Sequence, residues 1–379
     1  MIYLDNSATT KPYKDVLDTY VKVSETYFGN PSSLHNVGLQ AEQLIIKSRQ
    51  LVASLLKVDA KEVVFTSGGT ESNNLAIKGI AFEHSGRGKH LITTSVEHPS
   101  IDETFKSLEK IGYDVTYLPV DENGIVRLED VRKALRSDTI LVSMIHVNNE
   151  TGAIQPVKEI GKLLSRYPKV FFHVDHVQGI TKVPLSLKEA KIDLCTISAH
   201  KFHGLKGNGV LYVRSGVRLS PILLGGVQEA KLRAGTENVA GAAALAKALR
   251  LSMEQAKNVQ HLYELKRLTC EKLSTIEGIF LNSKEKNFAP HIVNFSIPGA
   301  KPEVIIQSLS EKNIYVSTKS ACSSKLASPS RVLLAMGVGK KKAESGIRVS
   351  FSFENTKEEV LIFTEIMSTL VPELLEVMR

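Results

Sequence analysis

Residues 192–204 read IDLCTISAHKFHG, an apolar run that passes directly into a polar cluster around Lys201. Ile192 to Ile197 has the composition of a short buried strand, and α/β sheets bind ligands where their strands end. Lys201 lies between two histidines, and neighbouring cations together with partial burial favour a neutral amine. A neutral lysine is a nucleophile that can form a Schiff base with an aldehyde. By itself, the heptapeptide SAHKFHG favours an ordinary basic surface loop.

Two stretches upstream of Lys201 add complementary chemistry. Val170 to Gly179 reads VFFHVDHVQG, a second buried strand with Asp175 at its end. Thr66 to Glu71 reads TSGGTE and leads from a strand into a helical segment, where small residues at a helix N-terminus form a phosphate cradle. An aspartate at the ring nitrogen and a lysine at the aldehyde are the protein contacts that make pyridoxal phosphate an electron sink. The order of phosphate loop, acid and lysine therefore predicts a pyridoxal phosphate site.

A series of short stretches matches one known family in chain order. From Leu4 to Phe351 they are YLDNSATT, FGNPSSLH, FTSGGTESNN, EHPS, HVNNETG, HVDHVQ, SAHKFHGLKG, RAGTEN, SACSS and IRVSF. On these motifs the chain resembles the cysteine desulfurases of the NifS/IscS type, in the class V aminotransferase group. The resemblance implies a pyridoxal phosphate enzyme of fold type I that converts L-cysteine to L-alanine.

The rhythm of predicted strands and helices indicates an α/β fold. Strands are predicted at 63–66, 90–94, 115–118, 140–146, 170–174, 194–198 and 210–213. Helical segments separate them, so we expect a mostly parallel seven-stranded sheet with helices on both faces. After a long helical region at 237–276, further strands and helices indicate a smaller α+β domain. We expect a large cofactor domain at 16–255 and a small domain made of 1–15 and 256–379.

The composition excludes several classes of protein. With 379 residues, 42% hydrophobic and 23% charged, the chain can bury a large core. It begins without a signal-peptide pattern, and no apolar run approaches the ~20 residues of a membrane span. Three cysteines without a CxxC pair favour a cytoplasmic protein and no structural zinc site. The net charge of +8 is diffuse apart from Lys340 to Lys342, which favours a solvated basic face over direct nucleic-acid binding.

The resemblance assigns the cofactor contacts position by position. Lys201 would bind the cofactor's aldehyde, Asp175 would keep the ring nitrogen protonated, and Gln178 would hydrogen-bond the phenolic oxygen. His98 would stack on the ring and could move protons, whereas the residues alone favour a loop-capping histidine. Asn149 would lie beside cofactor and substrate. Because the family forms homodimers, the phosphate would be bound by two subunits, through Gly69, Thr70, Ser198 and His200 of one and Thr236 of the other.

Two residues carry the predicted substrate chemistry. Arg348 lies in the otherwise apolar stretch IRVSF, where a guanidinium suits an amino-acid carboxylate and an internal salt bridge is the alternative. The resemblance assigns it to the α-carboxylate of L-cysteine. Cys195 and Cys270 fall in apolar or helical patterns and are interpreted as structural, whereas Cys322 lies among serines. The resemblance makes the Cys322 thiolate the nucleophile that takes the substrate's sulfur as a persulfide.

Two features depart from the family pattern. Lys319 stands where the family usually has glycine, and it could lower the pKa of the Cys322 thiol, contact a sulfur acceptor or reduce the freedom of the backbone. The chain ends soon after a last predicted helix at 358–378, which puts docking of an iron–sulfur scaffold through a longer tail in doubt. The persulfide would serve tRNA thiolation, thiamine or iron–sulfur pathways, and we favour a tRNA-thiolating enzyme over the iron–sulfur scaffold as acceptor. With a scaffold, Cys322 could still transiently ligate an iron–sulfur cluster.

Two alternatives stay open on the sequence alone. A selenocysteine lyase or another fold type I enzyme would use the same scaffold, and its products would distinguish it. A basic adaptor or nucleic-acid-binding protein with a degenerate fold is disfavoured, because the residues needed for catalysis occur together. These residues are Lys201, Asp175, His98, Arg348 and Cys322.

Overall fold

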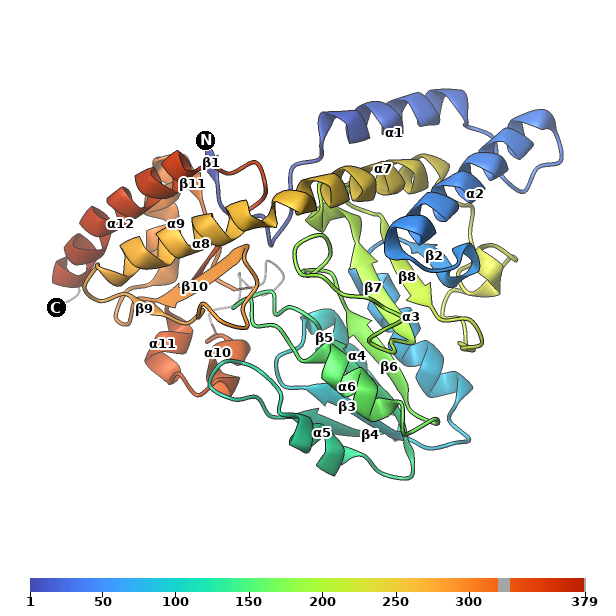
Figure 1. Ribbon diagram of the computed structural model, residues 1–379, viewed down its shortest axis with the longest axis horizontal. Helices are drawn as coiled ribbons and strands as arrows, with labels where there is room; N and C mark the ends of the chain where they lie inside the picture. The colour runs from blue at the N-terminus through green and yellow to red at the C-terminus, as the bar shows by residue number, and fades with distance from the viewer. Residues whose placement is uncertain (320–327, 378–379) are drawn as a thin grey trace.

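The computed structural model describes residues 1–319 and 328–377, and its centre is a seven-stranded sheet (Figure 1). The sheet confirms the predicted mostly parallel α/β architecture. Its strand order is β2-β8-β7-β6-β5-β3-β4, and β8 runs antiparallel to both of its neighbours. The strands are β2 (Val63–Thr66), β3 (His90–Thr94), β4 (Asp114–Leu118), β5 (Thr139–Ile145), β6 (Phe171–Asp175), β7 (Leu194–Ser198) and β8 (Gly209–Val213).

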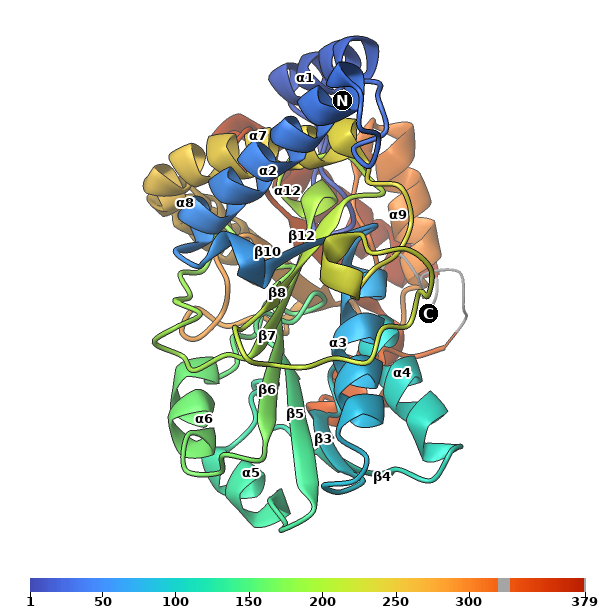
Figure 2. The ribbon, with the colours of Figure 1, turned by 90° about the vertical axis from the view of Figure 1, so that its right-hand side faces the viewer.

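Helices cover both faces of this sheet, as Figure 2 shows. On one face lie α3 (Gly69–Glu83) and α4 (Pro99–Glu109), and on the other lie α5 (Leu128–Ala134) and α6 (Val157–Leu164). Every residue of β3, β5, β7 and β8 is buried, and a separate apolar cluster fills each side. Burial on both faces explains why these strands have continuous apolar sequences instead of alternating ones.

A layer of longer helices connects this sheet to the smaller part of the molecule. The long helical region predicted from residue 237 is divided by a short 3-10 turn, so the prediction of continuous helix was wrong at that point. The helices of this layer are α1 (Lys14–Thr26), α2 (Asn36–Leu56), α7 (Val239–Gln255), the 3-10 turn η4 (Ala256–Asn258) and α8 (Val259–Ser274). Both α1 and α2 pack against α7.

The smaller part has its own sheet and its own apolar cluster. The antiparallel sheet has the order β12-β10-β9, and β1 pairs in parallel with β11. The elements are β1 (Ile2–Tyr3), β9 (Phe280–Leu281), β10 (Ile292–Ser296), α9 (Pro302–Glu311), β11 (Ile314–Tyr315), α10 (Arg331–Ala335), α11 (Lys340–Glu344), β12 (Gly346–Ser350) and α12 (Lys357–Val377). This is the α+β part expected from the sequence, while the domain boundary at 255/256 stays a prediction. In the described part of the chain, no helix has the length and apolar character needed to cross a membrane.

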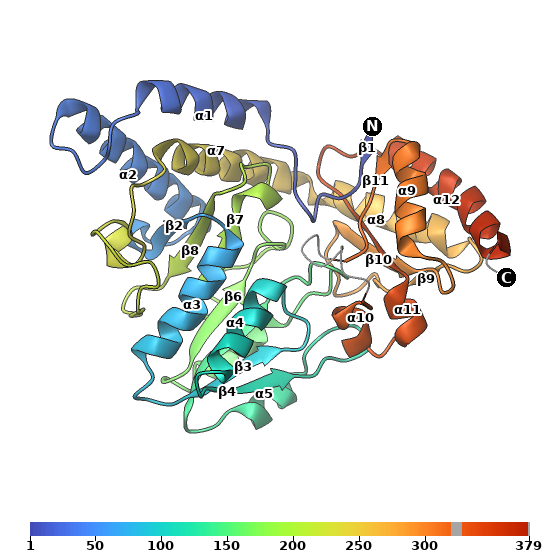
Figure 3. The same ribbon diagram turned by 180° about the vertical axis from the view of Figure 1, so that it is seen from behind.

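An N-terminal arm, residues 4–10, runs between the two parts (Figure 3). At its start, Leu4 donates a backbone hydrogen bond to Tyr315, which follows from the pairing of β1 with β11. At its end, Thr10 donates to the carbonyl of His200, directly after β7. The arm therefore passes the carboxyl ends of the large sheet's central strands, which is where ligands bind in α/β folds.

Candidate active site

A cavity of about 280 Å³ lies at the carboxyl ends of β5, β6 and β7, beside the N-terminal arm. Strand register explains the convergence, because Ile145 of β5 pairs with Asp175 of β6, and Asp175 pairs with Thr196 of β7. The cavity brings together most of the residues predicted to bind cofactor or substrate. These are Gly69, Thr70, His98, Asn149, Asp175, Gln178, Ser198, His200, Lys201 and Arg348.

Lys201 enters the cavity from the 3-10 turn η2 (Ala199–Lys201), which follows β7. Its Nζ donates to the carbonyls of Ser7 at 2.6 Å and Ala8 at 2.7 Å. Its own carbonyl accepts a hydrogen bond of 2.8 Å from the Nζ of the buried Lys182. Both ends of the residue are thus held in place, and the alternative of an ordinary basic surface loop is not supported.

A chain of hydrogen-bonded side chains connects Asp175 to His98. Asn73 of α3 donates both to Oδ2 of Asp175, at 3.0 Å, and to Oγ of Ser100, at 2.9 Å. That hydroxyl lies 2.9 Å from Nδ1 of His98. The acid and the imidazole, which come from different strand ends, therefore belong to one hydrogen-bonded network.

The two ends of this network have shifted pKa values. Burial raises the pKa of Asp175, and hydrogen bonds from Asn73 and Val177 together with the charge of Lys201 oppose that shift. Burial, with the positive charges of Lys201 and Arg331, lowers the pKa of His98 to about 4. His98 is therefore neutral at neutral pH. Its Nδ1 accepts from the backbone N–H of Ser100, which assigns the ring proton to Nε2.

His98 also caps the N-terminus of α4, which confirms the capping interpretation, and it lines the cavity, while its role toward the cofactor stays a prediction.

The start of α3 has the predicted features of a phosphate cradle. Gly68, just before it, has a φ of 149°, a conformation that favours glycine. The first amides of a helix lack intrahelical partners, so Gly69 and Thr70 can donate to an anion. Ser198 and His200 contribute a hydroxyl and an imidazole to the wall of the same cavity.

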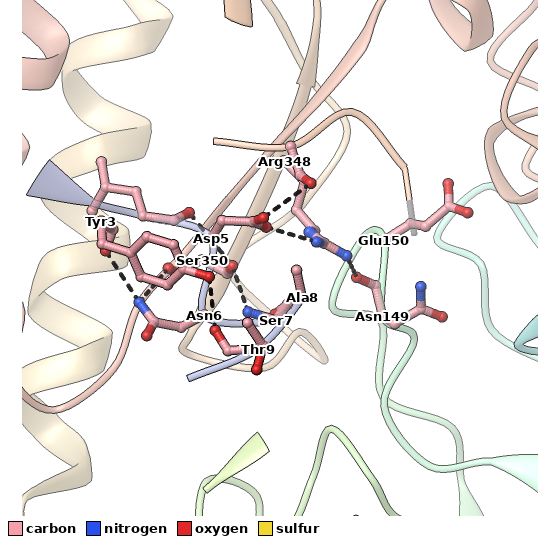
Figure 4. Close-up of polar contacts among 12 residues, drawn as sticks. Tyr3, Asp5, Asn6, Ser7, Ala8, Thr9, Asn149, Glu150, Arg348 and Ser350 are labelled. Carbon is pink, nitrogen blue, oxygen red and sulfur yellow. Dashed lines mark hydrogen bonds and ion pairs between the residues drawn. The ribbon is translucent and has the colours of Figure 1, made fainter. Parts of the chain in front are cut away.

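Arg348 reaches the cavity from β12, and its side chain is 1% exposed. Nη1 donates to the carbonyl of Asn149 at 2.7 Å, and Nη2 donates to Oδ1 of Asp5 at 2.9 Å (Figure 4). The internal ion pair that the sequence left as an alternative is therefore present. The guanidinium nevertheless lines the cavity, so the ion pair does not remove it from the site.

Several site residues were missed by the sequence analysis. Asn73 lies one helical turn after Gly69 within the motif FTSGGTESNN, and this spacing could have identified it. Ser100 follows His98 by two positions in a capping arrangement. The Ser7 carbonyl, which also accepts from Nε2 of Gln178 at 2.9 Å, carries no signal in the sequence because every residue has a carbonyl.

Of the predicted residues that the structure describes, Thr236 does not join the others in this cavity. Thr236 lines a separate cavity beside Arg233, and its predicted role toward the cofactor of another subunit stays a prediction. Cys322 lies outside the described residues. Lys319 donates to the carbonyl of Ser328, and its predicted effect on the Cys322 thiol is likewise untested.

The residues around the cavity fit pyridoxal phosphate. Within residues 1–319 and 328–377, Ser7 Oγ and Arg348 Nε are buried without a hydrogen-bond partner, and both residues line the cavity. Buried polar atoms of this kind require a partner, which a ligand can supply. An amine, a buried carboxylate and a helix N-terminus are complementary to the aldehyde, ring nitrogen and phosphate of this cofactor. The fold and the site together define the fold type I class of pyridoxal phosphate enzymes.

Comparisons with known proteins are consistent with this class. The family model for aminotransferase class-V matches residues 2–363. A NifS/IcsS protein homolog of Lactobacillus delbrueckii subsp. bulgaricus is 47% identical, over 95% of this chain and 94% of its own. A cysteine desulfurase IscS of Dictyoglomus turgidum is 41% identical, over 98% and 95%. A solved NifS-like protein superposes with a TM-score of 0.93 at 36% identity, over 98% and 100%. The chain belongs to the class-V aminotransferase family, within its NifS/IscS group of cysteine desulfurases.

Proposed function

We propose that the protein is a pyridoxal-phosphate-dependent cysteine desulfurase, which converts L-cysteine to L-alanine and keeps the sulfur as a persulfide on Cys322. The observation that carries this proposal is the single cavity shared by Lys201, Asp175 and Arg348. Full-length relatives that are named cysteine desulfurases support the same reaction.

The cofactor would be held entirely by residues of this cavity and by a second subunit. Pyridoxal phosphate, when bound, supplies an electron sink for negative charge at the α-carbon of the substrate. Lys201 would hold its aldehyde carbon, Asp175 its ring nitrogen and Gln178 its phenolic oxygen, while His98 would contact the ring. The phosphate would be held by Gly69, Thr70, Ser198, His200 and the partner subunit's Thr236.

The chain's own residues would perform the remaining steps. Arg348 binds the α-carboxylate beside Asn149, and the Lys201 amine, once the substrate's amine has displaced it from the aldehyde carbon, is the base that moves the α-proton. Cys322, as a thiolate, attacks the substrate sulfur. A sulfur–sulfur bond forms while the carbon–sulfur bond breaks, and the carbon takes up a proton to leave as L-alanine. No external oxidant is required, because the electrons of the broken bond stay on the carbon.

The reaction is tested by its products. Cofactor-loaded protein given L-cysteine and a thiol reductant should release L-alanine and sulfide in equal amounts. A keto acid in place of alanine would indicate an aminotransferase. Turnover of selenocysteine without turnover of cysteine would indicate a selenocysteine lyase. A protein that stays colourless after incubation with pyridoxal phosphate would contradict the whole proposal.

Arg348→Ala should raise the KM for L-cysteine by about 30-fold or more and leave the absorbance of the bound cofactor intact. Loss of a carboxylate contact in a desolvated site costs about 2–5 kcal/mol, which corresponds to this change. Steady-state kinetics and an absorbance spectrum measure the two quantities. Arg348→Lys, which keeps the charge but not the fork, should fall between wild type and Arg348→Ala. If Arg348→Ala loses folding without a specific change in KM, the ion pair of Arg348 with Asp5 has a purely structural role.

We also propose that two copies of the chain form the working enzyme in the cytoplasm. Several large apolar side chains are strongly exposed, and exposed apolar surface is typical of protein interfaces. They include Leu34 at 94%, Leu224 at 82%, Phe28 at 76% and Val227 at 68%. Light scattering across protein concentrations tests dimer formation.

For the sulfur acceptor we favour a tRNA-thiolating enzyme, because the exposed lysines of α11 suit an acidic or RNA-carrying partner.

A further inference from the structure

Asp5 is held against Arg348 by several independent contacts. Its Oδ1 accepts from Nη2 of Arg348 at 2.9 Å, and its Oδ2 accepts from the hydroxyl of Ser317 at 3.2 Å. The backbone carbonyl of Asp5 accepts from Ala8, which closes a turn of the N-terminal arm, and Asp5 also bridges to Ser350 at the end of β12. Figure 4 shows the carboxylate facing the guanidinium. The orientation of this acid is therefore fixed from both its side chain and its backbone.

Asp5 is also the counter-charge that contacts the guanidinium directly. Among the ion pairs of residues 1–319 and 328–377, Arg348 occurs only in the pair with Asp5. Glu150 is the other acid nearby, but burial raises the pKa of Glu150, and its Oε2 accepts from Ser330 at 2.5 Å. His291 adds no charge, because burial lowers the pKa of His291 well below its usual range. Among the described residues, the carboxylate that contacts the buried cation is therefore that of Asp5, whose side chain is 17% exposed.

A second carboxylate would have to share this guanidinium. Nη1 and Nη2 already donate to Asn149 and Asp5, whereas the buried Nε has no partner among the described residues. A substrate carboxylate at Arg348 would thus bind a cation that is oriented by Asp5 and whose charge Asp5 already offsets. Orientation favours binding and charge compensation opposes it, and the two effects can be separated experimentally.

We propose that Asp5 is a positioning residue that sets how tightly the site binds the carboxylate of its substrate. The inference rests on the proposed function, since it assumes that Arg348 receives an amino-acid carboxylate. In the wild-type protein, Asp5 stabilises the buried guanidinium of Arg348 while the site is empty. It also lowers the affinity of this guanidinium for a carboxylate, so that the amino-acid product can leave.

Asp5→Asn separates charge from orientation. The amide oxygen still accepts from Nη2, so the guanidinium stays oriented while its charge is no longer offset. Binding of a carboxylate should become tighter by at least about tenfold, because the removed unit charge lies within a few ångströms of the bound carboxylate and the effective dielectric of a protein site is well below that of water. The melting temperature should fall, because a buried charge loses its partner. Tighter binding combined with lower stability is a result that a purely structural role does not produce.

The experiment compares L-alanine with ethylamine, which is alanine without the carboxylate. Both amines are titrated into the cofactor-loaded protein, and binding is read from cofactor absorbance. The dissociation constant of ethylamine divided by that of L-alanine isolates the contribution of the carboxylate to binding. We expect this ratio to rise at least about tenfold in Asp5→Asn, with the loss in melting temperature partly restored by L-alanine. Asp5→Ala, which loses the acceptor as well, should give a smaller ratio than Asp5→Asn.

Asp18→Asn is the matched control, because it removes the same charge from an exposed position on α1 and should leave the ratio unchanged. An unchanged ratio in Asp5→Asn, or an equal change for ethylamine, would overturn the proposal. If Asp5→Ala does not fold, Asp5→Asn alone decides between these outcomes. Failure of the proposed function would look different, since wild-type protein would then form no L-alanine from L-cysteine whatever the amine ratios.

Discussion

Lys201→Ala protein should turn over L-cysteine at least about 10³-fold more slowly than wild type, because the variant lacks the amine that moves the α-proton. The structure strengthens this expectation. The amine is held in the cavity by the backbone carbonyls of Ser7 and Ala8. The buried Lys182 is directed at the carbonyl of Lys201, where its Nζ is already used as a donor. The rate of alanine formation measures the loss.

Two controls separate chemistry from folding in this prediction. Lys206→Ala removes an exposed lysine from the same loop and should turn over at the wild-type rate. Added methylamine should partly restore the activity of Lys201→Ala and not that of an unfolded protein. Borohydride reduction of the cofactor-loaded wild type, followed by peptide mapping, should place the cofactor on Lys201. A label on Lys182 or Lys206 would refute the assignment.

Cys322→Ser should bind the cofactor and the substrate normally and form no persulfide, because a serine hydroxyl is a far poorer nucleophile toward sulfur than a thiolate. The other two cysteines cannot easily replace it. Cys195 is fully buried in β7, and burial together with Asp175 raises the pKa of its thiol. Cys270 is partly buried in α8, and burial raises the pKa of this thiol as well. Mass spectrometry after incubation with sulfur-labelled cysteine measures persulfide formation.

The matched variants are Cys195→Ala and Cys270→Ser, which should both keep persulfide formation, the first with some loss of stability from the core. Labelled persulfide on Cys322→Ser protein would contradict the mechanism. The same labelled wild-type protein also tests the acceptor. Sulfur should pass faster to a tRNA-thiolating enzyme than to an iron–sulfur scaffold, and the opposite order would remove the proposed preference.

Much of the fold could be predicted because it depends on local patterns. Strands buried on both faces have continuous apolar sequences, and the helices between them have helical periodicity, so all seven strands of the large sheet were placed within about a residue or two. The break at η4 was missed, because Ala256–Asn258 carries no glycine or proline to interrupt a helical sequence.

The main residues that line the cavity were also accessible from the sequence. Lys201 and Asp175 lie at the ends of predicted strands, and parallel strands bring their carboxyl ends to one edge of a sheet. The motifs around His98 and Arg348 added the remaining chemistry through the family resemblance. For these residues the local sequence determines which strand or helix carries each residue and at which end of it the residue lies. The topology of the sheet then brings the residues together.

Only the tertiary structure decided how these residues are held. The pair of Asp5 and Arg348 joins positions 343 residues apart, and the contact of Ser7 with Lys201 uses a backbone carbonyl. Neither interaction leaves a pattern in the sequence, because a carbonyl is common to every residue and an ion pair between distant positions depends on how the arm crosses the sheet edge. The sequence by itself determined which chemical groups the site contains. The path of the N-terminal arm decided that Asp5 pairs with Arg348 and that backbone carbonyls orient the Lys201 amine. It also decided which buried polar atoms remain for a ligand to contact.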